Sequence, residues 1–482
     1  MERDMKKIIS QFVNKILGNP MVKKPMQGLA TLVVSSFLLA FSAQAMDRVE
    51  AVQDAKGWKL QVNGSDYYIK GVVWGYSPKG ENYNYNLYAR SDEFIKQVLD
   101  QEFGLMKAAG VNTIRMFGIM PPRWVTYVYE TYGIRTVINH LFGRYGFNVN
   151  GQWIPNTNYA DPATRQAIKN DILNLVETYK NTKGVLMFAL GNENNYGLDW
   201  ASFEIENLPV GERHREKAKS LYSLFNETIK EAKAIDKSHP YTIVNGDIQY
   251  LDLIRALCPD LDILGSNVYR GESFTGLWAD VKKSYDLPIV FMEFGSDAFN
   301  AKLNREDQQA QAELLRAMWL EMYDKSYGNG AEGNSIGGFV FEWRDEWWKY
   351  KQTENLDVQD NTASWANGGY KFDFVEGKNN MNEEWYGISR IGNIDSNGVY
   401  ITEPRMAYDV LSKIWSIDPY RVSKSSYTQT IQNIDMEFLA LRSEVRSLQS
   451  GGQQNAAFAM TGGSISGEMV LTGDKANIDK MA

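Results

Sequence analysis

Two glutamates follow short apolar runs of this sequence, at places where their carboxyl groups can act as a pair. Glu193 comes shortly after the run Val185 to Leu190, and Glu293 ends a second run that begins at Pro288. Hydrolysis of a sugar acetal needs two such groups, one that protonates the leaving oxygen and one anion that attacks or guides water. A lone Glu after a strand is usually an exposed loop residue, so the argument for catalysis rests on the repetition of the pattern.

The segments that must position these glutamates alternate between strand-like and helix-like patterns from residue 66 onward, which predicts a parallel sheet. The expected strands cover residues 67–74, 111–117, 134–139, 185–190, 241–245, 261–266, 288–294 and 336–343. The expected helices cover residues 91–109, 121–132, 161–180, 213–235, 251–257, 274–285, 306–323 and 404–415. Eight such units predict a closed (β/α)8 TIM barrel in the α/β class, in which the loops after the strands carry the chemistry.

An open, doubly wound sheet is the alternative architecture. Such sheets often bind a nucleotide at a glycine-rich loop between a strand and a helix. The one G-x-G-x-x-G pattern here begins at Gly328, follows a helix and precedes a strand, which is the wrong order for that fingerprint. In the barrel, Glu193 follows the fourth strand and Glu293 ends the seventh, so both can face a central cleft.

The motifs Gly191-Asn192-Glu193, Glu293-Phe294-Gly295 and GGFVFEW at 337–343 give the sequence a specific likeness. Together they resemble glycoside hydrolase clan A, the retaining barrel glycosidases, over residues 66–416. Residues 69–72, 112–115 and 337–340 are similar to the family 2 β-glycosidases and the family 72 glucanosyltransferases, with family 5 as a further relative. The chain departs from family 2 in having only about twenty residues between the predicted cleavage site and the barrel, where family 2 enzymes carry β-sandwich domains.

The resemblance implies that Glu193 is the acid/base and Glu293 the nucleophile. It also implies that Asn192 binds the sugar 2-hydroxyl and that Arg115, at the end of strand two, positions the nucleophile. Tyr269, after strand six, would hydrogen-bond to the nucleophile.

Aromatic and histidine side chains at other strand ends complete the expected substrate site. By the same resemblance Trp343 would form the floor of the −1 subsite, and Trp74 and His140, at the ends of strands one and three, are further substrate-binding candidates. Glu342 is the competing nucleophile, although strand alternation sets it on the opposite face from Trp343.

The composition is compatible with a glycan-binding protein and argues against nucleic acid as a partner. Aromatic residues make up 13% of the chain, which suits stacking on sugar rings and equally suits a large core. The net charge is −8, and residues 1–45 are basic, so the rest of the chain is clearly acidic and has no basic cluster. Cys258 is the single cysteine, so neither an intramolecular disulfide nor a cysteine-based metal site is expected.

The first 45 residues have the order of a signal peptide. A basic start is followed by the apolar run 28–41 and by Ala43-Gln44-Ala45, which predicts cleavage after Ala45 and export to the periplasm or the medium. An uncleaved membrane anchor is the alternative, because the uncharged run from Pro25 to Met46 is about long enough to span a bilayer.

The predicted domains are therefore a signal peptide (1–45), a catalytic barrel (46–420), a helix (421–450) and a small-residue polar tail (451–482). Within 431–448, apolar residues recur three and four apart over about two and a half heptads. This pattern predicts either a coiled coil that makes a homo-oligomer or an amphipathic helix folded onto the barrel.

The sequence as a whole predicts a retaining β-glycoside hydrolase that acts on a β-glucan or a related polysaccharide or oligosaccharide, without cofactor or metal. A transglycosylase would use the same two glutamates. A non-catalytic polysaccharide-binding scaffold is the alternative from a different class of protein.

Overall fold

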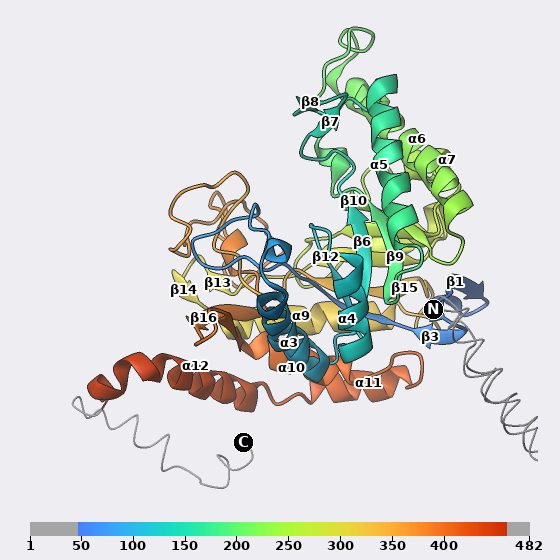
Figure 1. Ribbon diagram of the computed structural model, residues 1–482. Coiled ribbons are helices and arrows are strands. Elements are labelled where there is room, and N and C mark those ends of the chain that lie inside the picture. Colours follow the sequence, from blue (N-terminus) through green and yellow to red (C-terminus); the bar gives the residue numbers. More distant parts are fainter. Residues whose placement is uncertain (1–46, 460–482) are drawn as a thin grey trace, which may run out of the picture. The chain divides into compact units, whose positions relative to one another are not determined.

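The computed structural model describes residues 47–459 and contains a closed barrel of eight parallel strands (Figure 1). The predicted signal peptide and the end of the polar tail lie outside the described residues. The strands follow one another around the barrel in chain order, and they are β4 (Ile69–Val73), β5 (Thr113–Arg115), β6 (Arg135–His140), β9 (Val185–Leu190), β10 (Tyr241–Gly246), β11 (Ile263–Asn267), β12 (Ile289–Phe294) and β15 (Ser335–Val340). The predicted (β/α)8 barrel is confirmed.

An α-helix follows each strand, as the alternation in the sequence predicts. These helices are α3 (Asp92–Ala109), α4 (Pro122–Tyr132), α5 (Pro162–Tyr179), α6 (Val210–Ile235), α7 (Leu251–Leu257), α8 (Leu277–Ser284), α9 (Gln308–Asp324) and α10 (Met406–Trp415). Their ends are set by local chemistry. The Ser91 hydroxyl accepts a hydrogen bond from the Phe94 N–H at the start of α3, and Gly110 ends that helix with φ of 88°.

A three-stranded antiparallel sheet closes one end of the barrel, and the sequence did not predict it. Its strands are β1 (Val49–Asp54), β2 (Gly57–Val62) and β3 (Ser65–Tyr67). Leu60 and Val62 are buried in the same apolar cluster as Ile69 and Phe339 of the barrel strands. The Trp58 N–H donates to the carbonyl of Gly333, just before β15, so the sheet lies at the N-terminal ends of the strands.

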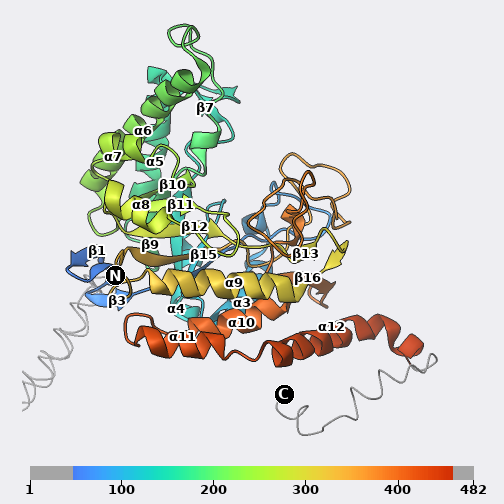
Figure 2. The same ribbon diagram turned by 180° about the vertical axis from the view of Figure 1, so that it is seen from behind.

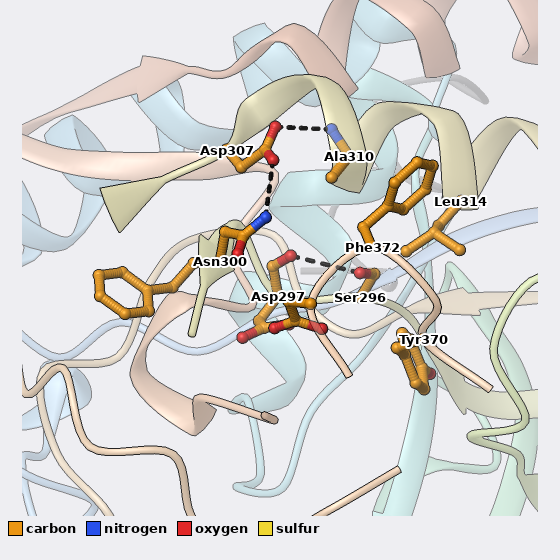
Figure 3. Close-up of a pocket in the computed structure, with 10 residues that line it drawn as sticks. Ser296, Asp297, Asn300, Asp307, Ala310, Leu314, Tyr370 and Phe372 are labelled. Atoms are coloured by element: carbon orange, nitrogen blue, oxygen red, sulfur yellow. Dashed lines mark hydrogen bonds between the residues drawn. The ribbon is translucent and has the colours of Figure 1, made fainter. Parts of the chain in front are cut away.

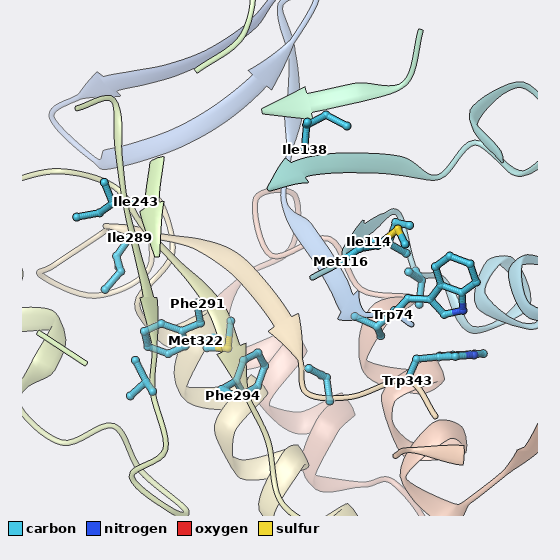
Figure 4. Close-up of a cluster of buried hydrophobic side chains, with 14 of the residues drawn as sticks. Trp74, Ile114, Met116, Ile138, Ile243, Ile289, Phe291, Phe294, Met322 and Trp343 are labelled. Carbon is cyan, nitrogen blue, oxygen red and sulfur yellow. The ribbon is translucent and has the colours of Figure 1, made fainter. Parts of the chain in front are cut away.

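A second apolar cluster fills the layer between the strands and the helices (Figure 4). It contains large aromatic side chains from both layers, including Trp74, Trp343 and Trp319. The Trp74 ring packs edge-on against Phe103 of α3 at 5.0 Å between centroids. These aromatic residues therefore contribute to folding by burying apolar surface.

Short 3-10 turns and two-stranded hairpins lie in the loops that follow the barrel strands. They are the 3-10 turns at Leu87–Ala89, Asn194–Tyr196 and Glu383–Trp385, and the hairpins β7 (Phe147–Val149) with β8 (Gln152–Ile154), β13 (Phe299–Asn300) with β14 (Arg305–Glu306), and β16 (Ser389–Ile394) with β17 (Tyr400–Pro404).

The tail forms two helices, α11 (Lys424–Gln432) and α12 (Met436–Ala459), rather than one continuous seam. Figures 1 and 2 show α12 beside α10 and α9, and Arg446 of α12 pairs with Asp409 of α10 at 2.5 Å. Leu448 is 70% exposed, so the predicted apolar repeat is broken between the two helices and partly faces solvent. Assembly of a homo-oligomer through 431–448 stays a prediction. None of the helices within 47–459 is long and apolar enough to cross a membrane.

Candidate active site

Glu293, near the end of β12, is held by two donors. Arg115 Nη1 donates to Glu293 Oε1 at 2.7 Å, and the Tyr269 hydroxyl donates to Glu293 Oε2 at 3.1 Å. Arg115 has no exposed surface and Glu293 is 6% exposed, so this ion pair is screened little by solvent. Both donors stabilise the negative charge of the carboxylate.

Arg115 is fixed by contacts on every side of its guanidinium group. Its Nε donates to Asn139 Oδ1 at 2.8 Å, and its Nη2 donates to Asn192 Oδ1 at 2.8 Å. The second acceptor for Nη1 is the carbonyl of Met292 at 3.0 Å. The strands β5, β6, β9 and β12 thus converge on one side chain, which sets the position of Glu293 within the barrel mouth.

Glu193 comes just after β9 and faces the same centre. Its Oε1 accepts a hydrogen bond from Asn267 Nδ2 at 3.1 Å, and the same amide donates to Asn192 at 3.2 Å. Glu193 has φ of 53°, in the left-handed region that costs a non-glycine residue about 1–2 kcal/mol. Such conformations cluster at functional sites, where surrounding structure over-determines them.

The environment of Glu193 favours its protonated form. Burial, and then the negative charge of Glu293, raise the pKa of Glu193 from 4.5 to about 7. The hydrogen bond from Asn267 and the charge of Arg144 oppose this shift in part. At neutral pH the pair therefore offers a proton on Glu193 beside a carboxylate held by Arg115, the division of roles that a carboxyl pair needs.

Two further carboxyl groups lie beyond β15, and the sequence analysis did not place them together. Glu342 is 2% exposed, and its Oε1 has no hydrogen-bond partner among the described residues. Burial and the charge of Glu346 raise the pKa of Glu342 well above its usual value. Burial and then the charge of Glu293 raise the pKa of Glu346 to about 8. Glu342 has no arginine hydrogen bond comparable with that of Glu293, which weakens it as the competing nucleophile.

Trp343 does not line the site, contrary to the prediction. Strand β15 ends at Val340, three residues before Trp343, so strand alternation does not fix the direction of the Trp343 side chain. Trp343 is fully buried, and its indole N–H donates to Glu102 of α3. Phe341 is the aromatic residue beside the site, with its ring 6.4 Å from that of Tyr269 and 6.3 Å from that of Phe117.

Trp74 and His140 are also wrong as substrate-binding predictions. Trp74 is 1% exposed and belongs to the cluster between the strands and the helices (Figure 4). His140 Nε2 lies 3.0 Å from Asp171 of α5, and its Nδ1 accepts the N–H of Phe142 at 3.0 Å. Both side chains point out of the barrel, because residues at strand ends alternate between its inner and outer faces.

Asn267 and Tyr145 are site residues that the sequence analysis missed. Asn267 ends β11 and pairs in register with Glu293 of the neighbouring strand. Its place at the end of an apolar run was the available signal, since the expected strand stopped one residue before it. The Tyr145 hydroxyl accepts a hydrogen bond from Asn192 Nδ2 at 3.0 Å, and it sits in the loop between β6 and β7, whose richness in Asn, Gly and aromatic residues was the available signal.

A small pocket elsewhere in the structure does not share this chemistry. It lies at the start of α9 and is lined by Asp297, Asn300, Asp307 and Tyr370 among others (Figure 3). Its volume of about 10 Å³ holds at most about one water molecule. Asp307 is used there as the cap of α9, accepting the N–H of Ala310 at 3.1 Å. Within residues 47–459, no group of three or more His, Cys, Asp or Glu side chains is placed to hold a metal ion.

A closed (β/α)8 barrel with two carboxyl groups at the C-terminal ends of its strands is the arrangement found in barrel glycosidases. The family model of the glycosyl hydrolases family 2, TIM barrel domain, matches residues 55–356. The chain belongs to this family. Comparison with curated proteins gives no match.

Solved structures of similar fold include three uronidases. β-D-Glucuronidase of Dictyoglomus thermophilum has 15% identity and a TM-score of 0.47 over 78% of this chain and 54% of its own. A β-glucuronidase of Bacteroides uniformis has 13% identity and a TM-score of 0.50 over 76% and 37%. The GH2 β-galacturonidase of Eisenbergiella tayi has 13% identity and a TM-score of 0.45 over 77% and 54%. The chain thus spans between 37% and 54% of the length of these structures, and at this identity the likeness concerns the fold alone.

Proposed function

We propose that the protein is a β-glycosidase that works by double displacement, with Glu293 as nucleophile and Glu193 as acid/base. The observation that carries the proposal is the asymmetry of the pair. Glu293 receives hydrogen bonds from Arg115 and Tyr269, while burial and the charge of Glu293 raise the pKa of Glu193 to about 7. The family match over residues 55–356 supports the same reaction.

In the first step, Glu293 attacks the anomeric carbon of the sugar while Glu193 gives its proton to the glycosidic oxygen. The bond to the leaving group breaks and an ester between the sugar and Glu293 forms. Asn192, which is held by hydrogen bonds with Arg115 and Tyr145, would bind the sugar 2-hydroxyl. In the second step, Glu193 takes a proton from water as the water oxygen attacks the ester, which releases the sugar.

A neutral sugar fits the position next to Glu293 better than a uronate. The guanidinium nitrogens of Arg115 already bind Asn139, Asn192 and Glu293, and Arg344 pairs with the buried Glu102 at 3.1 Å. The nearby carboxyl groups of Glu342 and Glu346, whose pKa values are raised by burial, supply no positive charge that would pair with a uronate. We therefore propose a β-glucan or a related polysaccharide as substrate, in contrast to the uronidases of similar fold.

Covalent labelling tests the mechanism. We would incubate the enzyme with a panel of 2-fluoro-glycosyl inactivators, measure the intact mass, and map the modified peptide. One added sugar on Glu293, absent from the Glu293→Gln variant, is the expected result, and the inactivator that reacts identifies the sugar. An adduct on Glu342 would overturn the assignment of the nucleophile.

A transglycosylase and a non-catalytic scaffold remain as second candidates from the sequence. Sizing the products formed from an oligosaccharide separates hydrolysis from transfer, because transfer makes products longer than the substrate. If no inactivator reacts and no oligosaccharide is cleaved, while calorimetry still detects glycan binding, the protein is a binding scaffold.

A further inference from the structure

Four aromatic side chains form a continuous surface cluster at the mouth of the barrel, which we call the aromatic patch. Its members are Tyr83, Tyr145, Trp348 and Tyr350. The ring centroids of Tyr145 and Tyr350 are 5.0 Å apart, those of Tyr350 and Tyr83 are 5.9 Å apart, and those of Tyr83 and Trp348 are 5.5 Å apart. The patch joins the loops after β4, β6 and β15, which all lie at the C-terminal ends of the strands.

Two members of the patch are exposed, and Tyr145 and Trp348 are partly buried beside them. Tyr83 is 43% exposed and Tyr350 is 51% exposed, and their hydroxyl groups have no hydrogen-bond partner within residues 47–459. The Trp348 indole N–H is buried and also lacks a partner among the described residues. Neighbouring exposed aromatic rings with unused polar tips are typical of a binding surface.

Hydrogen bonds to the backbone tie two of the loops that carry the patch, those after β4 and β15, to each other. Asn82 Nδ2 donates to the carbonyl of Gln352 at 2.8 Å, and the Gly80 N–H donates to the carbonyl of Leu356 at 2.8 Å. These bonds hold Tyr83 and Tyr350 close together without a ligand. A surface arranged in advance binds with less loss of conformational entropy.

One end of the patch reaches the candidate catalytic residues. The Tyr145 hydroxyl accepts the hydrogen bond from Asn192, and Asn192 in turn accepts the hydrogen bond from Arg115, which binds Glu293. A single extended ligand can therefore lie on Tyr350 and Tyr83 and also reach Glu293. This continuity favours an extended glycan over an unrelated protein partner, since sugar rings offer apolar faces for stacking and hydroxyl groups for the free polar tips.

We propose that the aromatic patch is an extended subsite that holds further sugar units of a glycan chain whose scissile bond lies at Glu193 and Glu293. This inference rests on the proposed function, because it takes the substrate to be a glycan. The substrate is then an oligosaccharide or polysaccharide, and binding of the outer units raises the rate at the scissile bond.

Calorimetry on the Glu293→Gln variant tests the patch separately from turnover. The probes are β-1,3- and β-1,4-linked gluco-oligosaccharides of two and six units. We expect the hexasaccharide to bind about tenfold more tightly than the disaccharide. Tyr83→Ala and Tyr350→Ala, each added to Glu293→Gln, should remove most of that advantage, whereas Tyr350→Phe should keep it because the ring remains.

Phe372→Ala is the matched control, since Phe372 is an exposed aromatic residue, 36% exposed, that lies outside the patch. It should preserve the preference for the longer chain. Equal binding of short and long glycans, or an equal loss for both lengths in Tyr83→Ala and Tyr350→Ala, would overturn the proposal. Thermal melting of each variant checks that the fold is retained.

The two proposals fail in different ways. Length-dependent binding without turnover by the wild-type protein keeps the patch and removes the proposed catalysis. Turnover of disaccharides and hexasaccharides at equal kcat/KM keeps the catalysis and removes the patch.

Discussion

Arg115 Nη1 donates a 2.7 Å hydrogen bond to Glu293 Oε1 from a side chain that has no exposed surface. The two residues lie on different strands, β5 and β12, and they form a buried ion pair at the mouth of the barrel. Removing one partner of a buried pair leaves the other charge uncompensated, which makes the pair a sharp target for mutation.

Arg115→Lys should lower both activity and stability. Lysine keeps the charge but lacks the planar fork that contacts Asn139, Asn192 and Glu293 together. We expect a loss of about 3 kcal/mol in the free energy of unfolding and at least about a hundredfold in kcat/KM. Denaturant unfolding and steady-state kinetics measure the two effects.

Arg123→Lys is the control for that experiment, because Arg123 pairs with Asp92 on the surface, where the side chains are 60% and 58% exposed. It should change stability by less than about 1 kcal/mol. If Arg115→Lys proves equally mild, Arg115 does not position Glu293.

The pH dependence of kcat/KM should show a loss of activity above about pH 7. Burial and the charge of Glu293 raise the pKa of Glu193 to about 7, and only its protonated form can donate to the leaving oxygen. The value of kcat/KM should therefore fall as the pH rises, by about tenfold per pH unit once Glu193 is ionised. Glu193→Gln should remove this alkaline limb. The loss of kcat/KM in this variant should be smallest for a substrate with a good leaving group.

Glu346→Gln tests a second carboxyl group near Glu293 that titrates in this pH range. The pKa of Glu346 is raised to about 8 by burial and by Glu293. The alkaline limb should survive Glu346→Gln, since Glu193 remains. A limb that disappears in Glu346→Gln and persists in Glu193→Gln would assign the proton donor to Glu346.

Trp343→Phe should destabilise the protein without changing catalysis much. The change removes the indole N–H donor to Glu102, a fully buried carboxyl that also accepts from Thr402 at 2.7 Å. Loss of a hydrogen bond to a charged group costs about 1.5–3 kcal/mol. Phe341→Ala should have the opposite profile, with lower kcat/KM, because Phe341 packs beside Tyr269. Melting temperatures and kinetics of both variants check this. If Trp343→Phe lowered kcat/KM more than Phe341→Ala, Trp343 would be a substrate-binding residue, as the sequence predicts.

The mature protein should begin at Met46. Expression of the full chain in a bacterial host, followed by intact mass measurement of the exported fraction, tests cleavage after Ala45. Leu38→Arg together with Leu39→Arg interrupts the apolar run and should keep the precursor inside the cell. A membrane fraction that retains residues 1–45 would show an uncleaved anchor instead.

Sequence periodicity was sufficient for the barrel because its signals are local. Each buried strand reads as an apolar run, and each helix begins and ends with capping residues such as Ser91 and Gly110. The sheet formed by β1 to β3 was not predicted, since its role depends on Leu60 and Val62 meeting barrel residues far away in the chain. The predicted apolar seam of the tail is divided between α11 and α12, which both contact α9, while α12 also contacts α10.

By itself, the sequence determined that the chain forms a (β/α)8 barrel and that two carboxyl groups lie at the ends of apolar strands. It did so because local apolar runs and the residues that bound them indicate the order and the ends of the strands. Only the tertiary structure decided which side chains meet there. It brought Asn267 to Glu193 and Phe341 to Tyr269, and it turned Trp343 toward Glu102. The physical reason is that side-chain direction beyond a strand end depends on barrel register and loop path, and that the pKa of Glu193 depends on burial among residues distant in sequence.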